Sequence, residues 1–311
     1  VLGQGSADQV LTSDGTDISW EDAGGGASDL DGLSDCKSGG TDFGSSLIIG
    51  HQTTGTLSAA SYNTAVGHGS FDAVTLGGYN TCIGYNSLTA NTFGTLNTAV
   101  GFAALASTVT NLTDVQTAVG FAALENSVGE NNTAVGAYAG TATTSGTNNL
   151  FLGIDSGRTG SPGGNITTAS NEVCIGDENI SAANIQVDWT IASDKRDKTD
   201  VSPLDLGLEF INQLEPVTYR WDKRSKYDKK DQSVVPDGTH KEEQLEGGFL
   251  AQDVEVIEEQ YGHKLSDKTN LTFHLSEDEK MYGIKYSKFV PMLVKAVQEL
   301  SAEVEELKKD K

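Results

Sequence analysis

A five-residue phrase, Asn-Thr-Ala-Val-Gly, returns through the first two thirds of this chain at a spacing near 17 residues. Its clearest copies end at Gly67, Gly84, Gly101, Gly120 and Gly136, and looser copies end at Gly50, Gly153 and Gly176. A period of this length marks a solenoid, in which each repeat is one rung and stacking neighbours bury a shared core. Such a region has no compact pocket of its own, so its work is done along a surface.

Aligning the closing glycines reveals columns of similar residues. The residue before each glycine is always β-branched or leucine, as in Val66, Ile83 and Val100. The first five copies follow the glycine with a ring, which predicts stacking between rungs better than it predicts a metal site: His51, His68, Tyr85, Phe102 and Phe121. An apolar residue comes four places after the glycine: Phe71, Leu88, Leu105, Leu124 and, in the last copy, Ile180.

These short apolar runs, broken by glycine and asparagine, predict a mainly β fold with about eight rungs over residues 27–192. Cys82 and Cys174 stand in the alanine column, so we interpret them as packing residues rather than as disulfide partners or metal ligands. Because so short a rung cannot enclose a wide core, we expect neighbouring chains to bury their apolar columns against one another.

Two segments flank the repeats. Residues 1–26 predict a small hairpin over Gln9–Trp20, with a tight turn at Asp14-Gly15, followed by the Gly24–Gly26 linker. Residues 193–311 are charged and favour helices, with short amphipathic stretches at Leu204–Leu214 and Gln252–Gln260. The chain therefore divides into a hairpin and linker, a repeat region and an α+β domain.

Charge and hydropathy exclude two classes of partner. The net charge is −23, and residues 1–192 contain only two basic residues, Lys37 and Arg158. Nucleic-acid binding needs clustered Lys and Arg, so we expect no nucleic-acid partner. No apolar run approaches the ~18 residues of a membrane-spanning helix, so we expect no membrane insertion.

The repeat region resembles the heads of trimeric autotransporter adhesins, whose similar repeats build a parallel β-roll from three chains, and it also resembles repeats of bacteriophage tail fibres. This resemblance implies a homotrimer. Residues 287–311 predict a coiled-coil helix with three heptads, whose a and d positions are Val290, Leu293, Val297, Leu300, Val304 and Leu307. Valine at a with leucine at d nominally favours two strands, but three heptads are too few to overrule a long β interface.

A serine and a lysine stand five residues apart at the junction between the repeats and the α+β domain. Ser193 is a potential nucleophile, and Lys198 is its potential base when the amine is neutral. Neighbouring cations favour the neutral amine, whereas Asp194 and Asp197 oppose it. Taken alone, these residues fit a solvated charged turn best.

Three blocks in order resemble the C-terminal intramolecular chaperone of endosialidases and phage tail spikes and fibres. They are SDKRDK from Ser193, GFLAQDV from Gly248 and YSKFVPMLVKAVQEL from Tyr286. The resemblance implies that Ser193, with Lys198 as general base, attacks the preceding carbonyl and cleaves Ala192–Ser193 in a single turnover. It also implies that residues 193–311 trimerise and align the rod before they are released.

We therefore expect a homotrimeric tail-fibre component of a virion, assembled in the host cytoplasm. Its partners would be itself, an upstream tail or fibre protein, and a host-surface receptor such as a glycan or an outer-membrane component. We expect no cofactor and no metal, and we expect no glycosidase activity because a plain rod supplies no cleft for paired carboxylates. The alternatives are a bacterial trimeric surface adhesin, a chaperone-tipped fibre that does not cleave itself, and a transcription factor that uses the same chaperone.

Overall fold

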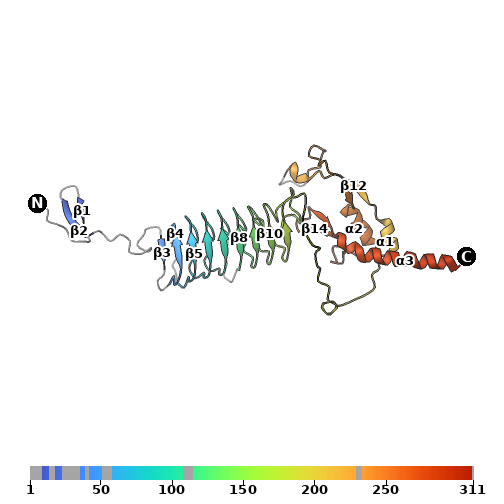
Figure 1. Cartoon of the computed structure of the whole chain (residues 1–311), viewed down its shortest axis with the longest axis horizontal. Coiled ribbons are helices and arrows are strands. Elements are labelled where there is room, and N and C mark those ends of the chain that lie inside the picture. Colours follow the sequence, from blue (N-terminus) through green and yellow to red (C-terminus); the bar gives the residue numbers. More distant parts are fainter. Residues whose placement is uncertain are drawn as a thin grey trace. The chain divides into compact units, whose positions relative to one another are not determined.

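The structure, a computed structural model, describes residues 9–13, 18–22, 36–38, 42–50, 58–107, 115–228 and 233–309. The chain forms two compact units (Figure 1). The first comprises residues 1–154 with 170–173, and the second comprises residues 155–169 with 174–311. The last loops of the repeat region therefore belong to the same unit as the C-terminal domain.

The N-terminal hairpin predicted over Gln9–Trp20 is present. Strand β1 (Gln9–Ser13) pairs antiparallel with β2 (Ile18–Asp22). The turn between the strands and the predicted linker Gly24–Gly26 lie outside the described residues.

The repeat region forms a nine-stranded sheet whose strands follow one another in chain order (Figure 1). Strand β3 (Cys36–Ser38) enters antiparallel to β4, whereas β4 to β10 are parallel, with equivalent residues of successive repeats in register. The strands from β4 onward are β4 (Leu47–Ile49), β5 (Thr64–Val66), β6 (Thr81–Ile83), β7 (Thr98–Val100), β8 (Thr117–Val119), β9 (Thr133–Val135), β10 (Leu150–Leu152) and β11 (Val173–Ile175). These eight strands match the eight predicted rungs, and the predicted β-solenoid is confirmed.

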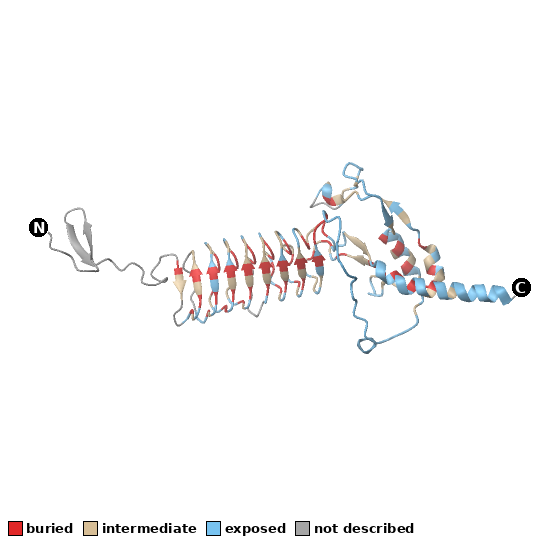
Figure 2. Cartoon of the chain, in the orientation of Figure 1, coloured by how far each residue is buried: buried red, intermediate tan, exposed pale blue. Residues whose placement is uncertain are grey.

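Buried residues recur at equivalent places along the repeat region (Figure 2), and they form two columns. The central residue of each strand from β4 to β11 is buried, including Ala65, Cys82 and Ala99. The column four places after the closing glycine is completely buried: Phe71, Leu88, Leu105 and Leu124. Burial raises the pKa of the Cys82 thiol, and both Cys82 and Cys174 are buried free cysteines, as expected of packing residues. Ile180, four places after the last closing glycine, is 57 % exposed instead, and among the described residues no strand of this sheet follows β11.

A single chain thus closes a narrow core by itself. The expectation that each rung needs neighbouring chains to bury its apolar columns is wrong for the inner columns, because alanine and leucine are small enough to fill the space within one rung. The outer column, which precedes the closing glycine, is not enclosed within one chain: Val66, Ile83 and Val135 are 37–43 % exposed.

The predicted stacking of rings is confirmed on the outer surface. His68, Tyr85, Phe102 and Phe121 stack in sequence, with ring centroids 5.7, 5.2 and 4.9 Å apart. Tyr138 continues the column edge-on to Phe121. His51, the first predicted member, lies outside the described residues.

The asparagine that opens five of the eight repeats has a structural role. Its side chain is buried, and its Oδ1 accepts a hydrogen bond from the backbone N–H of the equivalent residue one rung later, as from Asn80 to Asn63 (2.9 Å) and from Asn97 to Asn80 (3.0 Å). The Nδ2 of Asn80 donates to the Gly94 carbonyl (2.9 Å). Each buried amide thereby satisfies backbone groups that the loops would leave unpaired.

The closing glycine is required by close packing of the backbone. Gly101 has a φ of +135°, and a Cβ there would lie 2.3 Å from the Gly120 carbonyl oxygen. Only glycine combines this backbone conformation with so short an approach. This explains why glycine recurs at this place in every copy of the phrase.

The C-terminal domain is α+β, as predicted. Helices α1 (Leu208–Gln213), α2 (Ala251–Gln260) and α3 (Phe289–Lys309) enclose a core whose buried members are Leu206, Phe210, Leu214, Val254, Phe289 and Met292. Two short antiparallel pairs complete the domain: β12 (Val217–Tyr219) with β13 (Glu246–Gly248), and β14 (Phe273–Leu275) with β15 (Tyr282–Ile284). Three 3-10 turns connect these elements: η2 (Lys195–Asp197), η3 (Arg224–Lys226) and η4 (Tyr286–Lys288). The predicted helix over 287–311 begins at Phe289, after η4.

Candidate functional site

The predicted serine and lysine are in contact. Asp194 precedes η2 and accepts a hydrogen bond from the Arg196 backbone N–H (2.9 Å), which starts the turn. The turn brings Lys198 back toward the start of the segment, so that its Nζ lies 2.5 Å from Ser193 Oγ and 3.4 Å from the Ser193 carbonyl oxygen. A five-residue spacing in sequence thus becomes a direct hydrogen bond between the two side chains.

The charges around this pair neutralise one another. Arg196 forms an ion pair with Asp194, with Nη2 2.6 Å from Oδ2. The side-chain hydrogen bond from Arg196, together with its backbone N–H, lowers the pKa of the Asp194 carboxyl. Asp194 is therefore paired with Arg196 and not with Lys198, whose Nζ lies next to the serine hydroxyl. Ser193 and Lys198 are both exposed in the single chain.

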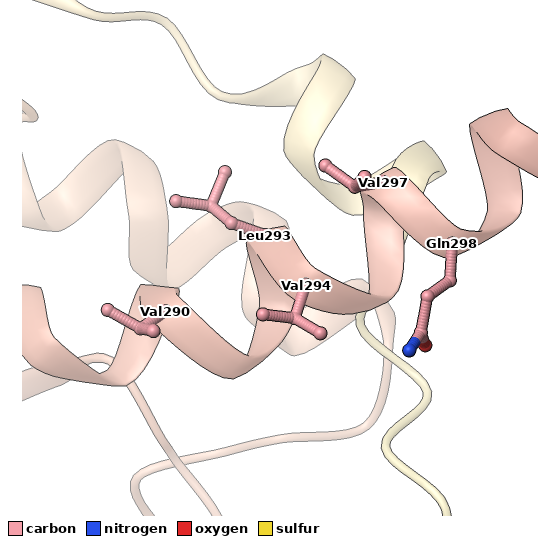
Figure 3. A pocket seen from close by; sticks show the side chains of 5 residues that line it. All are labelled: Val290, Leu293, Val294, Val297 and Gln298. Carbon is pink, nitrogen blue, oxygen red and sulfur yellow. The ribbon is translucent and has the colours of Figure 1, made fainter.

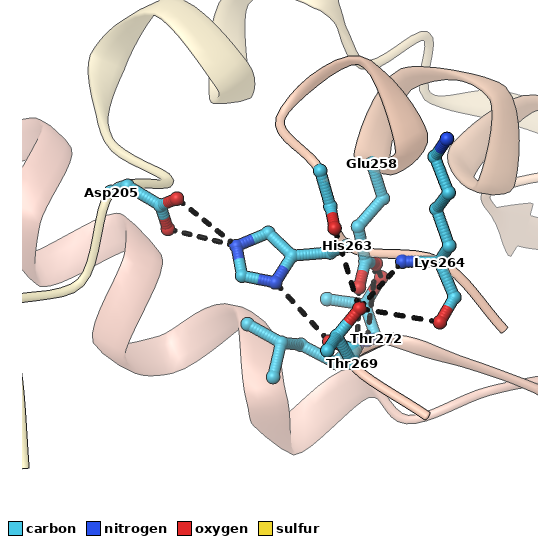
Figure 4. Close-up of polar contacts among 8 residues, drawn as sticks. Asp205, Glu258, His263, Lys264, Thr269 and Thr272 are labelled. Atoms are coloured by element: carbon cyan, nitrogen blue, oxygen red, sulfur yellow. Dashed lines mark hydrogen bonds and ion pairs between the residues drawn. The ribbon is translucent and has the colours of Figure 1, made fainter. Parts of the chain in front are cut away.

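A second polar cluster holds the body of the domain together (Figure 4). The Nε2 of His263 lies 2.9 Å from Asp205 Oδ1, and its Nδ1 lies 3.2 Å from the Thr269 carbonyl oxygen. Partial burial raises the pKa of the Asp205 carboxyl, but the hydrogen bond with His263, the charge of His263 and backbone N–H donors together outweigh it, and the pKa falls below its ordinary value. The buried Glu258 accepts hydrogen bonds from the backbone N–H groups of Leu271 and Thr272. These contacts connect Asp205 and the end of α2 to the segment that precedes β14.

The Glu277 carboxylate of the C-terminal domain binds the loop at Thr167–Ala169, which precedes β11. Glu277 accepts the backbone N–H groups of Thr167 (2.9 Å), Thr168 (3.0 Å) and Ala169 (3.1 Å), and also the Thr168 hydroxyl. Partial burial raises the pKa of Glu277, but these donors together outweigh burial and lower the pKa to about 2. The donors lie more than 100 residues away in the sequence, so no local pattern announced this contact.

Helix α3 has two apolar faces. One face packs inward through the buried Phe289, Met292 and Ala296. The other consists of the predicted heptad positions together with Val294, and its members are 41–66 % exposed: Val290, Leu293, Val294, Val297, Leu300, Val304 and Leu307. Figure 3 shows an open hollow on this face, lined by Val290, Leu293, Val294, Val297 and Gln298. An apolar stripe of this length is typical of a surface that associates with another helix.

Two further observations concern metal ions and membrane-spanning helices. No group of three or more His, Cys, Asp and Glu side chains among the described residues is arranged to hold a metal ion. In the same part of the chain, no helix combines the length and apolar character that a membrane crossing requires.

Comparison with protein families supports the chaperone interpretation. A family model described as the chaperone of endosialidase matches residues 193–263. The matched stretch begins at Ser193, includes Lys198 and ends at His263. Over this stretch the chain is similar to that chaperone family, which supports a chaperone domain in the C-terminal part and suggests trimeric self-association. The comparisons with curated proteins and with solved structures found no match.

Proposed function

We propose that this chain is a trimeric fibre component whose C-terminal domain, residues 193–311, assembles three copies and then cleaves itself from the rod. The observation that carries the cleavage is the hydrogen bond from Lys198 Nζ to Ser193 Oγ, at the first residue of the chaperone match. The exposed stripe of α3 supports the assembly role, because burying it requires other copies of the helix.

The chemistry is an attack by Ser193 on its own peptide bond. Lys198, in its neutral form, takes the hydroxyl proton, and Oγ bonds to the carbonyl carbon of Ala192. The carbon–nitrogen bond then breaks, and the Ser193 nitrogen receives the proton from Lys198. The product is an ester between Ala192 and Ser193 Oγ. Water hydrolyses this ester, leaving a carboxylate on Ala192 and a free hydroxyl and amine on Ser193.

A removable clamp suits the structure of the rod. Its strands repeat the same residues, so three rods can align with one another in several registers. A trimeric domain at one end brings equivalent rungs to the same level before long-range pairing begins, which shortens a slow search. Cleavage afterwards makes the assembly hard to reverse, since the element that guided it is gone.

The mature rod, in this proposal, serves attachment of a virion to its host. Its outward loops at Thr89–Leu96 and Thr141–Asn148 are the candidate receptor contacts, and an upstream tail or fibre protein would hold residues 1–26. A bacterial surface adhesin is a second candidate, favoured by the resemblance of the repeats to adhesin heads.

Mass spectrometry of the expressed chain tests the proposal. Wild-type protein should yield a fragment of residues 193–311, whereas Ser193→Ala and Lys198→Ala should remain at full length. Lys195→Ala is the matched control: it removes a lysine from the same turn and should still be cleaved. A wild-type chain that stays whole would refute self-cleavage and favour a non-cleaving clamp. Native spectra that show only monomers would refute the assembly role.

A further inference from the structure

The stretch from Ile185 to Ile191, just before the proposed cleavage site, has an unusual pattern. It reads IQVDWTI, in which every second residue is large and apolar. These four side chains are among the most exposed in the described chain: Ile185 52 %, Val187 72 %, Trp189 74 % and Ile191 70 %. Polar residues occupy the alternate positions.

A period of two is the signature of a strand with one apolar face. Among the residues that the structure describes, this stretch pairs with no strand, and a bend falls at residues 186–187. Exposed loops normally carry few large apolar residues, and apolar surface of this kind marks an interaction site. The sequence therefore encodes a strand that the isolated chain leaves unpaired.

We propose that residues 185–191 associate with the same residues of two other copies, with the apolar side chains directed at a shared threefold axis. This inference rests on the proposed trimer. The apolar stripe of α3, in the same unit, already favours self-association, and the chaperone match implies three copies.

Given a trimer, the charge pattern selects which face of the stretch lies toward the axis. Around a threefold axis, each residue meets its own equivalent at the same level. The odd-numbered positions then place valine against valine and tryptophan against tryptophan. The opposite face would bring three copies of Asp188 together, and like charges at that distance repel. Only one face of the stretch is compatible with a trimer.

The position of the stretch gives it a function. It precedes the Ala192–Ser193 bond, so cleavage would leave it attached to the rod. The three strands would then hold the end of the mature rod together after residues 193–311 have departed. In this arrangement residues 193–311 hold the three chains together during assembly, and residues 185–191 hold them together after cleavage.

Cysteine cross-linking tests the inference in the full chain carrying Ser193→Ala, which keeps the chain intact. Val187→Cys places a thiol on the apolar face, and Asp188→Cys is the matched control on the opposite face. Leu300→Cys, on the α3 stripe, reports whether the copies associate at all. The three native cysteines are buried, so the parent chain should give little background. Samples are oxidised and separated under denaturing, non-reducing conditions.

We expect Val187→Cys to give at least fivefold more covalent dimer than Asp188→Cys. Circular dichroism of each variant checks that the fold is retained. If Leu300→Cys cross-links while Val187→Cys gives no more dimer than Asp188→Cys, the strand inference is overturned and the trimer stands. If none of the three cross-links, the proposed trimer itself is overturned, and the inference falls with it.

Discussion

Replacing Leu293 and Leu300 by alanine tests the trimer clamp most directly. Their side chains are 48 % and 49 % exposed, so assembly has about half of each leucine left to bury. Leu→Ala removes about three CH₂ groups, worth ~2.4 kcal/mol when fully buried, and hence ~1.2 kcal/mol for the exposed half. Two leucines in each of three chains bring the loss to ~7 kcal/mol per trimer.

A loss of this size has a large effect on assembly. It lowers the trimer association constant by ~10⁵-fold. The concentration for half-assembly varies as the inverse square root of that constant, so it should rise ~300-fold. Alanine keeps the helix itself intact, because it has the highest helix propensity.

The assay is refolding of the full chain carrying Ser193→Ala at a series of concentrations, with trimer yield measured by sedimentation velocity. Refolding is needed because a rod that has already paired would mask the clamp. Glu306→Ala, on an exposed face of the same helix away from the heptad stripe, is the control and should assemble like the parent. If the double variant assembles at the same concentration as this control, the stripe does not mediate assembly and the reasoning is refuted.

Two further predictions concern stability. Glu277→Gln in the same background should lower the unfolding temperature at neutral pH relative to the control Glu279→Gln. Because the pKa of Glu277 is about 2 in the folded chain and ordinarily 4.5, its contribution is complete above about pH 4.5 and is lost as the pH falls through 2. A pH-independent difference between wild type and variant would contradict this. Gly101→Ala should destabilise the rod more than Gly262→Ala, by about 1–3 kcal/mol, since both have positive φ but only Gly101 meets backbone within 4 Å; equal unfolding temperatures would exclude the close-packing explanation.

Much of the rod could be predicted from its repeats. The alignment of closing glycines located the strands, because identical residues must occupy identical places in successive rungs. The length of a rung did not reveal the width of the core, because that width also depends on which polar side chains lie inside the solenoid. Asn80 and its equivalents fill part of that interior and satisfy the loops, a role visible only from their hydrogen bonds.

Some features of the candidate site could likewise be predicted from the sequence, and others could not. Ser193 and Lys198 could be selected by resemblance, but their contact depends on the Asp194 cap and the 3-10 turn, which the sequence did not specify. Glu277 could not be found at all, because its partners at Thr167–Ala169 come from a distant loop. The exposed α3 stripe was predicted, since heptad periodicity is a local property.

The variation among the repeats bears on why a clamp is needed. A slip of one rung between neighbouring chains would place Val66 against the level of Ile83, and Tyr85 against Phe102, which are nearly equivalent contacts. The energetic penalty would come only from the rung left unpaired at each end and from the few repeats of unequal length. The closing glycines Gly101 and Gly120 are separated by 19 residues, Gly120 and Gly136 by 16, and Gly153 and Gly176 by 23, so the spacing of the glycines distinguishes one register from another at these three places alone. Because so little of the rod encodes its own alignment, we expect the information to come from an aperiodic element, and under the proposed function the C-terminal domain with its non-repeating core would supply it.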